Sequence, residues 1–315
     1  MFTVIIPVYN KAATLGKAIE SVYAQQERDW EMVVIDDGSK DDFEAAIAPY
    51  AADPRIRIVR QQNSGVSVAR NRGIELAREP YLAFLDADDE WLPNHLSEFR
   101  RMIAQESGAG VYATGYRVQF ADGSSTDKSC LVDDGATLRE SDLFAHAYRN
   151  GGQQVLNTAG TCVWSEAVRR CGGFEPGERI GEDTDFFLRI AARYDAVLCN
   201  TVTAIYHRDL STATDDEGFL NYDWVFQKRE HAFLADESIP AEKRFYIRCL
   251  LDHFRIHKAR HYLMEGRRRE AVAEMKRVRW DPRRWRRIAV TWGMLLVPSP
   301  VLNALYRRKR EKEPM

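Results

Sequence analysis

The sequence predicts an α/β protein whose open, mostly parallel sheet carries helices on both faces. Short apolar runs rich in β-branched residues alternate with segments of helical periodicity over the first 105 residues of the 315-residue chain. Two of these runs stop abruptly at acidic clusters, Asp36-Asp37 and Asp86 to Glu90. Ligands of such sheets bind at the carboxyl ends of the strands, so we expect both clusters at one functional edge.

The individual elements follow from local patterns, taken in chain order. The expected strands are short and apolar, and they read FTVIIPV (2–8), EMVVIDD (31–37), RIRIVRQ (55–61) and YLAFL (81–85). A helix after the first strand is indicated by apolar residues at helical spacing, Leu15, Ala18, Ile19 and Val22. Further helices are expected at 42–50, at 66–78 behind a cap at 63–65, and from Pro93.

The middle of the chain, about 108–165, has a less regular pattern. FADGSS (120–125) predicts a hairpin turn, and a helix near 139–149 and a strand near 159–164 follow. GEDTDFFLRIAARY (181–194) predicts a helix with acidic residues at its start and one apolar face, Phe186, Phe187, Ile190 and Ala191. From about residue 217 the pattern is helical and increasingly basic, so we expect a domain at 1–215 and a helical region at 216–315.

Charge and cysteine content restrict the class of protein. Residues 240–315 hold 21 Lys and Arg against 8 Asp and Glu, a net charge of +13, whereas the preceding residues have a net charge of −15. A basic tail on an acidic body indicates an anionic partner for the tail. The five cysteines are scattered and contain no C-x-x-C pair, which favours a reducing compartment. The start, MFTVIIPVYN, resembles a first strand rather than a signal peptide.

The acidic cluster FLDADDEW (84–91) raises the question of what offsets its charge. D-x-D at a strand end suits Mg²⁺ or Mn²⁺, whose charge would relieve the repulsion between the carboxylates. The alternative is a solvated loop with acids near a helix N-terminus. A dinucleotide fold is disfavoured because no G-x-G-x-x-G follows the first strand, and a receiver domain leaves Asp86-x-Asp88 unexplained.

Several motifs in order resemble those of family 2 glycosyltransferases, which have the GT-A fold. They are VIIPVYNKAATLGKAIESVYAQ, EMVVIDDGSKDD, QQNSGVSVARNRGIELA, YLAFLDADDEWLP and CGGFEPGERIGEDTDFFLRIA. The resemblance covers about residues 2–212. It implies a Rossmann-like sheet and a nucleotide-sugar donor, usually a UDP-sugar, bound across the sheet edge.

The resemblance implies a role for each matching residue on the donor side. Pro7 and Tyr9 would flank the base, and Asp36 and Asp37 would meet the uracil and ribose, although a charged turn is the alternative for both acids. Arg70 would contact the nucleotide, or be a plain helix-surface arginine.

The D-x-D residues are implied to hold the metal and the donor. Asp88 would be the direct ligand of Mn²⁺ or Mg²⁺, and Asp86 would contact the ribose or metal-bound water. His207, in IYHRDLSTAT, would complete the metal site or touch the diphosphate, or be structural. Trp91 would border the donor sugar or lie in the core.

The E-D pair is implied to serve the acceptor. Asp183 would be the general base that takes the proton of the acceptor hydroxyl, and Glu182 would line the donor and acceptor pocket. A single displacement would invert the anomeric configuration. The alternative is a pair of acids favoured by the helix dipole. No Q-x-x-R-W follows, which favours transfer of a single sugar.

The basic tail predicts contact with a membrane. Residues 288–306 carry no charge and lie between RRWRR and RRKR, with Trp285 and Trp292 at the boundary. Pro298 and Pro300 disfavour a straight spanning helix, so we expect an interfacial or re-entrant element on anionic lipid. A spanning helix, or packing on protein, is the alternative. No nucleic-acid motif accompanies the basic residues.

The sequence therefore predicts an inverting, metal-dependent glycosyltransferase at the cytoplasmic face of the cell membrane. Its acceptor would be a glycan or lipid-linked hydroxyl, as in bacterial surface polysaccharide synthesis. A catalytically inert glycan-binding or scaffold relative, and a sugar-phosphate nucleotidyltransferase, are the alternatives. The chain lacks the Gly-rich loop of the latter after its first strand.

Overall fold

The computed structural model describes residues 1–133, 135–150, 155–178, 181–208, 228–282 and 285–302. These residues form two compact units. The first contains the described residues up to Arg208 together with residues 228 and 229, and the second begins at Glu230.

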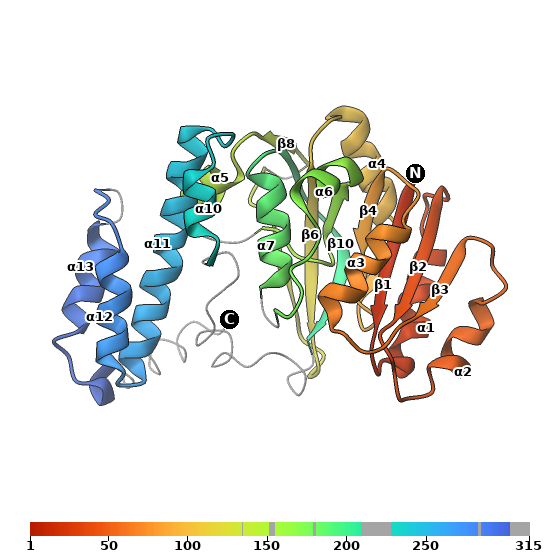
Figure 1. Cartoon of the computed structure of the whole chain (residues 1–315), viewed down its shortest axis with the longest axis horizontal. Helices are drawn as coiled ribbons and strands as arrows, with labels where there is room; N and C mark the ends of the chain where they lie inside the picture. The colour runs from red at the N-terminus through yellow and green to blue at the C-terminus, as the bar shows by residue number, and fades with distance from the viewer. Residues whose placement is uncertain (134, 151–154, 179–180, 209–227, 283–284, 303–315) are drawn as a thin grey trace. The chain divides into compact units, whose positions relative to one another are not determined.

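The first unit contains one sheet with the strand order β3-β2-β1-β4-β9-β6-β10-β5 (Figure 1). The strands are β1 Phe2–Val8, β2 Trp30–Asp36, β3 Ile56–Arg60, β4 Tyr81–Phe84, β5 Glu90–Trp91, β6 Val111–Phe120, β7 Ser125–Lys128, β8 Thr137–Glu140, β9 Thr161–Trp164 and β10 Ala196–Arg208. The four N-terminal strands pair in parallel, and β6 and β10 are also parallel. Between these groups, β9 runs antiparallel to both β4 and β6.

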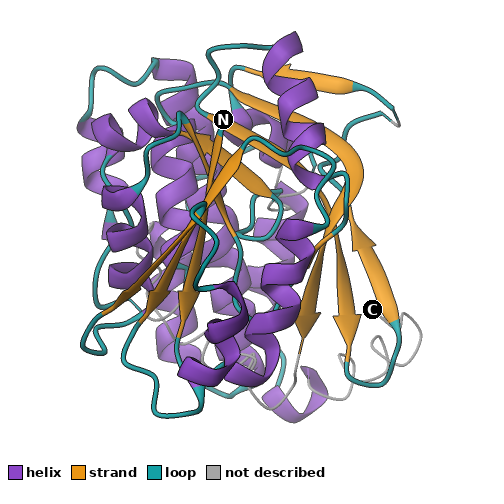
Figure 2. Cartoon of the chain, turned by 90° about the vertical axis from the view of Figure 1, so that its right-hand side faces the viewer, coloured by secondary structure: helices purple, strands orange, loops and turns teal. Residues whose placement is uncertain are grey.

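Helices lie on both faces of this sheet (Figure 2). They are α1 Ala12–Tyr23, α2 Phe43–Ile47, the 3-10 turn η1 Ala48–Tyr50, α3 Val66–Leu76, α4 His95–Gln105, α5 Leu143–Arg149, α6 Ser165–Cys171 and α7 Glu182–Ala191. Alternate residues of a strand point to opposite faces. Accordingly Val4 and Ile6 belong to the core cluster that contains Leu15 of α1, whereas Val33 and Ile35 pack with α3.

Gly73 brings α3 close to the central strand. A Cβ at this position would lie 2.3 Å from Cγ2 of Ile5, much closer than two carbon atoms can approach. Only glycine allows this contact, so the sequence fixes the distance between α3 and β1. The helix in turn carries Arg70, which is described below.

Pro7 lies in a central strand, where proline is unusual because it has no N–H to donate. The N–H of Asp37 donates to the carbonyl of Val8 at 2.8 Å, and that of Leu85 to the carbonyl of Ile5 at 3.0 Å. Residues 5 and 7 therefore face β4, and the β1–β4 pairing already ends at Ile5. Pro7 therefore lacks an N–H at a position where β1 is no longer paired with β4, so no hydrogen bond between these strands is lost.

The second unit is helical, with α10 Glu230–Ala235, α11 Ala241–Met264, α12 Arg268–Arg277 and α13 Trp285–Met294. Its core includes Ile256, Leu263, Ala271, Met275 and Ile288, contributed by α11, α12 and α13. Within the described ranges, we find no helix that combines the length and the apolar character needed to cross a membrane. The expected apolar segment 288–306 ends outside the described residues, at 303–306.

Most of the expected elements are confirmed, but one expectation needs correction and one strand was missed. The helix expected near 139–149 begins only at Leu143, because residues 137–140 form β8 against β10. The longest strand, β10, had not been predicted, although Thr201, Val202, Thr203 and Ile205 give it the β-branched content of a strand. The segment 209–214, which follows His207, lies outside the described residues.

Candidate active site

The loops that follow β1, β2 and β4 form the candidate site. Strand register aligns their starts, since Val8 pairs with Asp36 and β4 pairs with β1 up to Phe84. Asn10, in the first loop, adopts a positive φ of 53°. Its side-chain oxygen accepts from the N–H of Lys40 at 2.8 Å, and its own N–H donates to Ser39 at 3.0 Å. The first two loops are thus held together.

Asp36 and Asp37 are buried and bind the protein itself. Asp36 accepts from the N–H of Ser39 at 2.8 Å and pairs with Arg60 at 3.0 Å. Asp37 accepts from the side chain of Gln61 at 2.7 Å, and from the N–H groups of Ser64 and Gly65 at 3.0 and 2.8 Å. These bonds match the charged-turn alternative. Contact of either acid with a base or ribose stays a prediction.

The D-x-D loop is partly open to solvent. The side chains of Asp86 and Asp88 are 28% and 33% exposed. The Lys11 ammonium lies 2.7 Å from Oδ2 of Asp88, and the Lys17 ammonium 2.5 Å from Oε1 of Glu90. In the described residues the loop thus meets two lysines from the β1–α1 segment, which the sequence had not singled out. Lys11 lies in the loop after β1, whose position at a strand end was the available signal, whereas Lys17 lies within α1.

Asp89 is the buried member of this acidic loop. Its Oδ1 accepts from the backbone N–H of His207 at 2.9 Å, so it ties the loop to β10. Burial raises the pKa of Asp89 well above its usual range, and the neighbouring charges of Asp86 and Asp88 raise it further. A cation at this loop would relieve that repulsion. The imidazole of His207 lies against Glu90, beside the loop, and pairs there rather than with Asp88.

Arg70 joins the two acidic motifs. Its Nη2 donates to Asp86 at 2.8 Å, and its Nη1 donates to Glu182 at 3.0 Å, although Glu182 lies 112 residues further along the chain. The side chain is only 4% exposed, so the helix-surface alternative for Arg70 is wrong. Burial opposes its charge, yet the two carboxylates and Asp183 hold its pKa above the ordinary value. Arg70 therefore fixes the D-x-D loop against the start of α7.

The E-D pair opens α7, as predicted. Glu182 and Asp183 occupy the first turn. Burial and the neighbouring Asp183 raise the pKa of Glu182, which Arg70 partly offsets. Oδ1 of Asp183 accepts from the N–H of Thr184 at 2.6 Å. The side chain of Asp183 is only partly buried, so the pair contains one carboxylate bound to arginine and one near solvent.

The rest of α7 is anchored in the core. Phe186 stacks on Phe174 of the G-G-F segment, with ring centroids 4.0 Å apart. The buried Arg189 pairs with Asp185 at 2.8 Å and donates to the carbonyl oxygens of residues 171 and 172 at 2.6 and 3.0 Å. The conformation of the G-G-F segment and the position of the E-D pair are therefore linked.

The two residues expected at the base differ in exposure. Pro7 is buried in β1, whereas the ring of Tyr9, directly after the strand, is 43% exposed. An exposed aromatic ring at a ligand edge is suited to stacking on a planar base. Tyr9 therefore has the required access, and Pro7 supports the strand beneath it.

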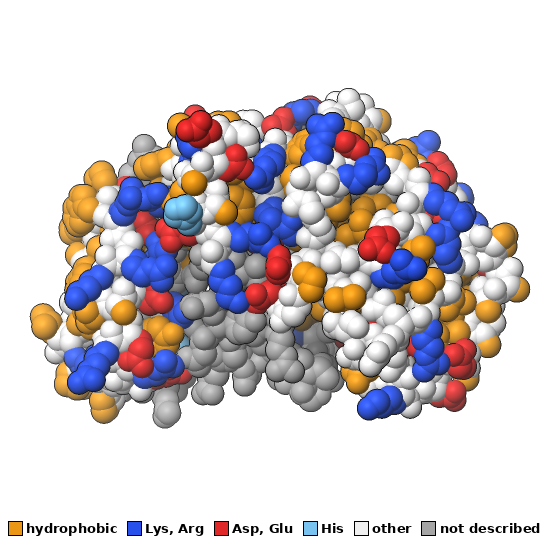
Figure 3. All heavy atoms as spheres, viewed as in Figure 1, with side chains coloured by type: hydrophobic (Ala, Val, Ile, Leu, Met, Phe, Trp, Pro, Cys, Tyr) orange, Lys and Arg blue, Asp and Glu red, His pale blue; other side chains and the backbone are white. Residues whose placement is uncertain are grey.

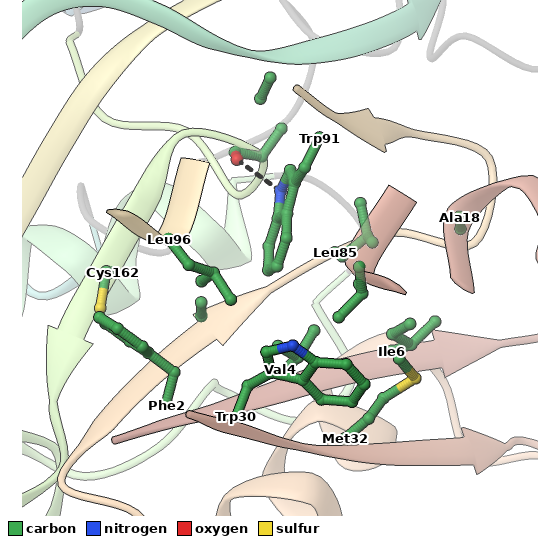
Figure 4. Close-up of a cluster of buried hydrophobic side chains, with 14 of the residues drawn as sticks. Phe2, Val4, Ile6, Ala18, Trp30, Met32, Leu85, Trp91, Leu96 and Cys162 are labelled. Carbon is green, nitrogen blue, oxygen red and sulfur yellow. Dashed lines mark hydrogen bonds between the residues drawn. The ribbon is translucent and has the colours of Figure 1, made fainter. Parts of the chain in front are cut away.

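Trp91 packs in the core, the second of the two roles expected for it. It is 3% exposed, its indole N–H donates to the carbonyl of Ala159 at 3.1 Å, and its ring stacks on His95 with centroids 4.1 Å apart. Figure 4 shows it among Leu85, Leu96 and other buried side chains. Its apolar ring and buried bond explain this position better than a sugar pocket does.

The carboxylates of the acidic loop fit a divalent cation whose other coordinating oxygens come from a bound diphosphate and water. Among the residues that the structure describes, no three His, Cys, Asp or Glu side chains gather as a complete metal site. Asp88 is nevertheless a partly exposed carboxylate beside further like charge, and Mg²⁺ usually takes one or two carboxylates plus phosphate oxygens and water. The residues present therefore suit a metal that arrives with a diphosphate.

Comparison with known proteins identifies the family to which this chain is similar. Residues 3–170, over half of the chain, match the family model described as Glycosyl transferase family 2. The chain is 36% identical over 130 residues to a putative teichuronic acid biosynthesis glycosyltransferase of Bacillus subtilis, covering 41% of this chain and 51% of that protein. It is 28% identical over 243 residues to a putative colanic acid biosynthesis glycosyl transferase of Escherichia coli, covering 74% and 82%. The chain spans only about half the length of the B. subtilis relative.

Solved structures share the fold. Staphylococcus aureus TarS 1–349 in complex with UDP-GlcNAc superposes with a TM-score of 0.70 at 16% identity, covering 98% of this chain and 92% of that one. A Pyrobaculum calidifontis mannosyltransferase in complex with GDP-Man and Mn²⁺ gives a TM-score of 0.56 at 17% identity, covering 96% and 83%. The predicted GT-A fold, with a helical C-terminal region, is confirmed.

Proposed function

Because the chain belongs to glycosyl transferase family 2, we propose that it transfers one sugar, with inversion, from a nucleotide-sugar to a hydroxyl of a glycan or lipid-linked acceptor. The bridge from Asp86 through Arg70 to Glu182 carries this proposal, since it joins the donor-side and acceptor-side motifs in one site. A UDP-sugar is the first donor to test, because TarS was solved with UDP-GlcNAc. Relatives named for teichuronic and colanic acid synthesis support a role in bacterial surface polysaccharide formation.

The transfer is a single displacement. The acceptor oxygen forms a bond to the anomeric carbon as the bond from that carbon to the diphosphate oxygen breaks. The proton of the acceptor hydroxyl passes to Asp183, and the nucleoside diphosphate leaves with the electron pair. Inversion follows because attack and departure occur on opposite faces of the sugar.

The other residues bind and position the reactants. Mn²⁺ or Mg²⁺, bound through Asp88, would neutralise charge on the departing diphosphate. Lys11 supplies a second positive charge beside Asp88. Arg70 acts through Asp86 and Glu182 and is a positioning residue. Tyr9 offers a stacking surface for the base, and Asp37 holds the loop that follows β3.

The C-terminal unit is proposed to meet an anionic membrane surface. Trp285, Val290, Trp292 and Leu296, in and just after α13, are 48%, 56%, 41% and 87% exposed. Figure 3 shows basic side chains interspersed with apolar ones over the C-terminal helices, on the left of that view. A surface of this composition suits the headgroup region of a bilayer. Flotation with anionic liposomes tests this, and equal binding by wild type and Trp292→Ser/Leu296→Ser would contradict it.

Calorimetric titration of UDP tests the donor site. We expect binding in Mn²⁺ that is lost in EDTA and in Asp88→Ala but kept in Asp122→Ala, a matched change in the exposed β6–β7 turn. Asp183→Asn should keep UDP binding and lose sugar transfer. GDP binding in place of UDP would change the donor and keep the site. Failure of every nucleotide under every metal condition would contradict the proposal and favour an inert relative.

A further inference from the structure

The helical unit contains a cavity of about 240 Å³ that the proposed transfer does not use. One wall is a stripe of α11 that includes Phe245, Arg248 and Ile256, residues that share a helix face by their spacing. The opposite wall comes from the segment after α12, with Arg279 and Trp280, and from α13. All of these described lining residues belong to the second unit.

Two arginines, Arg248 and Arg279, line the cavity. Neither the side chain of Arg248 nor that of Arg279 forms an ion pair or hydrogen bond with any residue that the structure describes. Arg248 is half-buried, whereas Arg279 is exposed. Arginine pairs that face one space are suited to phosphate, which accepts several of their N–H donors at once.

The two acids at the cavity, Asp252 and Asp281, have interactions with groups other than the side chains of Arg248 and Arg279. Asp252 pairs with Arg255 at 3.0 Å and accepts from the backbone N–H of Arg279 at 3.3 Å. Asp281 has an interaction of its own, so it is not a free counter-ion either. The two arginine side chains therefore remain available to an anion.

The remaining lining is mostly apolar. Phe245 and Trp280 line the cavity and are 50% and 68% exposed overall, and Ile256, Val278 and Ile288 add aliphatic surface. Among the described lining residues, the neutral polar groups are the Cys249 thiol and the indole N–H of Trp280. The volume lies below the usual range for a whole drug-sized ligand, so it fits a headgroup and the first carbons of a chain.

We propose that this cavity binds the phosphate of an amphiphile, a phosphate ester of an apolar chain, with Arg248 and Arg279 on the phosphate and the aromatic rims on the chain. Such a ligand is either a membrane phospholipid or a lipid-linked acceptor. In the second case the cavity would bind the lipid phosphate of the acceptor, and this possibility rests on the proposed function.

The test is calorimetry of the full chain with geranyl phosphate, dihexanoyl phosphatidic acid, geraniol and inorganic phosphate. We expect geranyl phosphate to bind, and Arg248→Ala/Arg279→Ala to weaken it by about tenfold or more, since charge-assisted bonds are lost. Arg269→Ala, an exposed arginine of α12 outside the cavity, is the matched control and should bind as wild type does. Circular dichroism checks that each variant keeps its helical content, and UDP is titrated in parallel.

Each outcome decides the proposal. Binding of geranyl phosphate alone supports it with a lipid-linked source, and comparable binding of phosphatidic acid supports it with a membrane source. Equal affinity for inorganic phosphate or for geraniol overturns the proposal, because the cavity would then recognise only the phosphate or only the apolar chain. No binding, or an equal loss in Arg269→Ala, also overturns it. Because UDP is titrated in parallel, failure of this site and failure of the donor site are distinguishable.

Discussion

Replacing Arg70 with methionine should destabilise the first unit strongly. The change keeps the apolar stem and removes hydrogen bonds to Asp86 and Glu182 at 2.8 and 3.0 Å. Removing one partner of a buried ion pair costs about 3–5 kcal/mol. Both carboxylates keep some solvent access, 28% and 13%, so we expect the lower end, about 3 kcal/mol. For a unit of this size the melting temperature should fall by about 6–12 °C.

The pH dependence of that loss tests the electrostatic reasoning. Burial and Asp183 already raise the pKa of Glu182, and Arg70 lowers it. Without Arg70, the pKa of Glu182 in the folded protein rises further above its value in the unfolded chain, so folding of the variant favours protonated Glu182. Stability that is present at low pH is then lost as pH rises through the folded pKa. The difference between variant and wild type should be larger at about pH 8 than at about pH 5.

Urea and thermal unfolding at both pH values provide the measurement. Arg72→Ala is the matched control, because this arginine of the same helix is 48% exposed and, among the described residues, pairs with Glu75 alone, across one turn. Its removal should cost under about 0.5 kcal/mol. A loss under about 1 kcal/mol for Arg70→Met, or a loss that grows as pH falls, would refute the reasoning.

Three further changes give distinct expectations. Asp89→Asn removes a charge that burial and the neighbouring carboxylates disfavour. Without metal, the variant should therefore have a higher free energy of unfolding at neutral pH than wild type, and this free energy should decrease less as the pH rises. A destabilised variant would contradict this expectation. Gly73→Ala should lower the free energy of unfolding by about 1–3 kcal/mol, because the added Cβ clashes with Ile5. In urea unfolding, the double variant Gly73→Ala/Ile5→Ala should lose less stability than the sum of the two single variants. Additive losses would exclude the clash. Lys11→Met frees Asp88, so Mn²⁺ should bind more tightly in the absence of nucleotide by calorimetry; weaker binding would assign Lys11 another role.

Much of the fold could be predicted because it depends on local pattern. The first strand, the helix around Ala18 and the acidic start of α7 all follow from periodicity and from where apolar runs stop. The mixed character of the sheet could not be predicted in this way. Its cause is β9, which enters between β4 and β6 in the opposite direction, and such pairing is set by contacts distant in sequence.

The site follows the same division. Strand ends placed Asp37 and Asp88 correctly at one edge, since carboxyl ends of parallel strands meet there. The partners of Arg70 could not be seen, because Glu182 is 112 residues away and nothing local to α3 points to it. Trp91 shows the limit of motif reasoning, since its neighbours in sequence belong to the site while its ring belongs to the core.

Proline at position 7 has a consequence for how this chain tolerates change. An ordinary residue there would present a hydrogen-bond donor toward a place that β4 has already vacated, and the nearest chain to satisfy it would be the segment that begins at Leu85. Proline removes that donor, so the backbone at residue 7 cannot extend the β1–β4 pairing into the acidic turn. Pro7 therefore marks the boundary between the sheet and the acidic loop, and a substitution that restores the N–H should lengthen the β1–β4 strand pair.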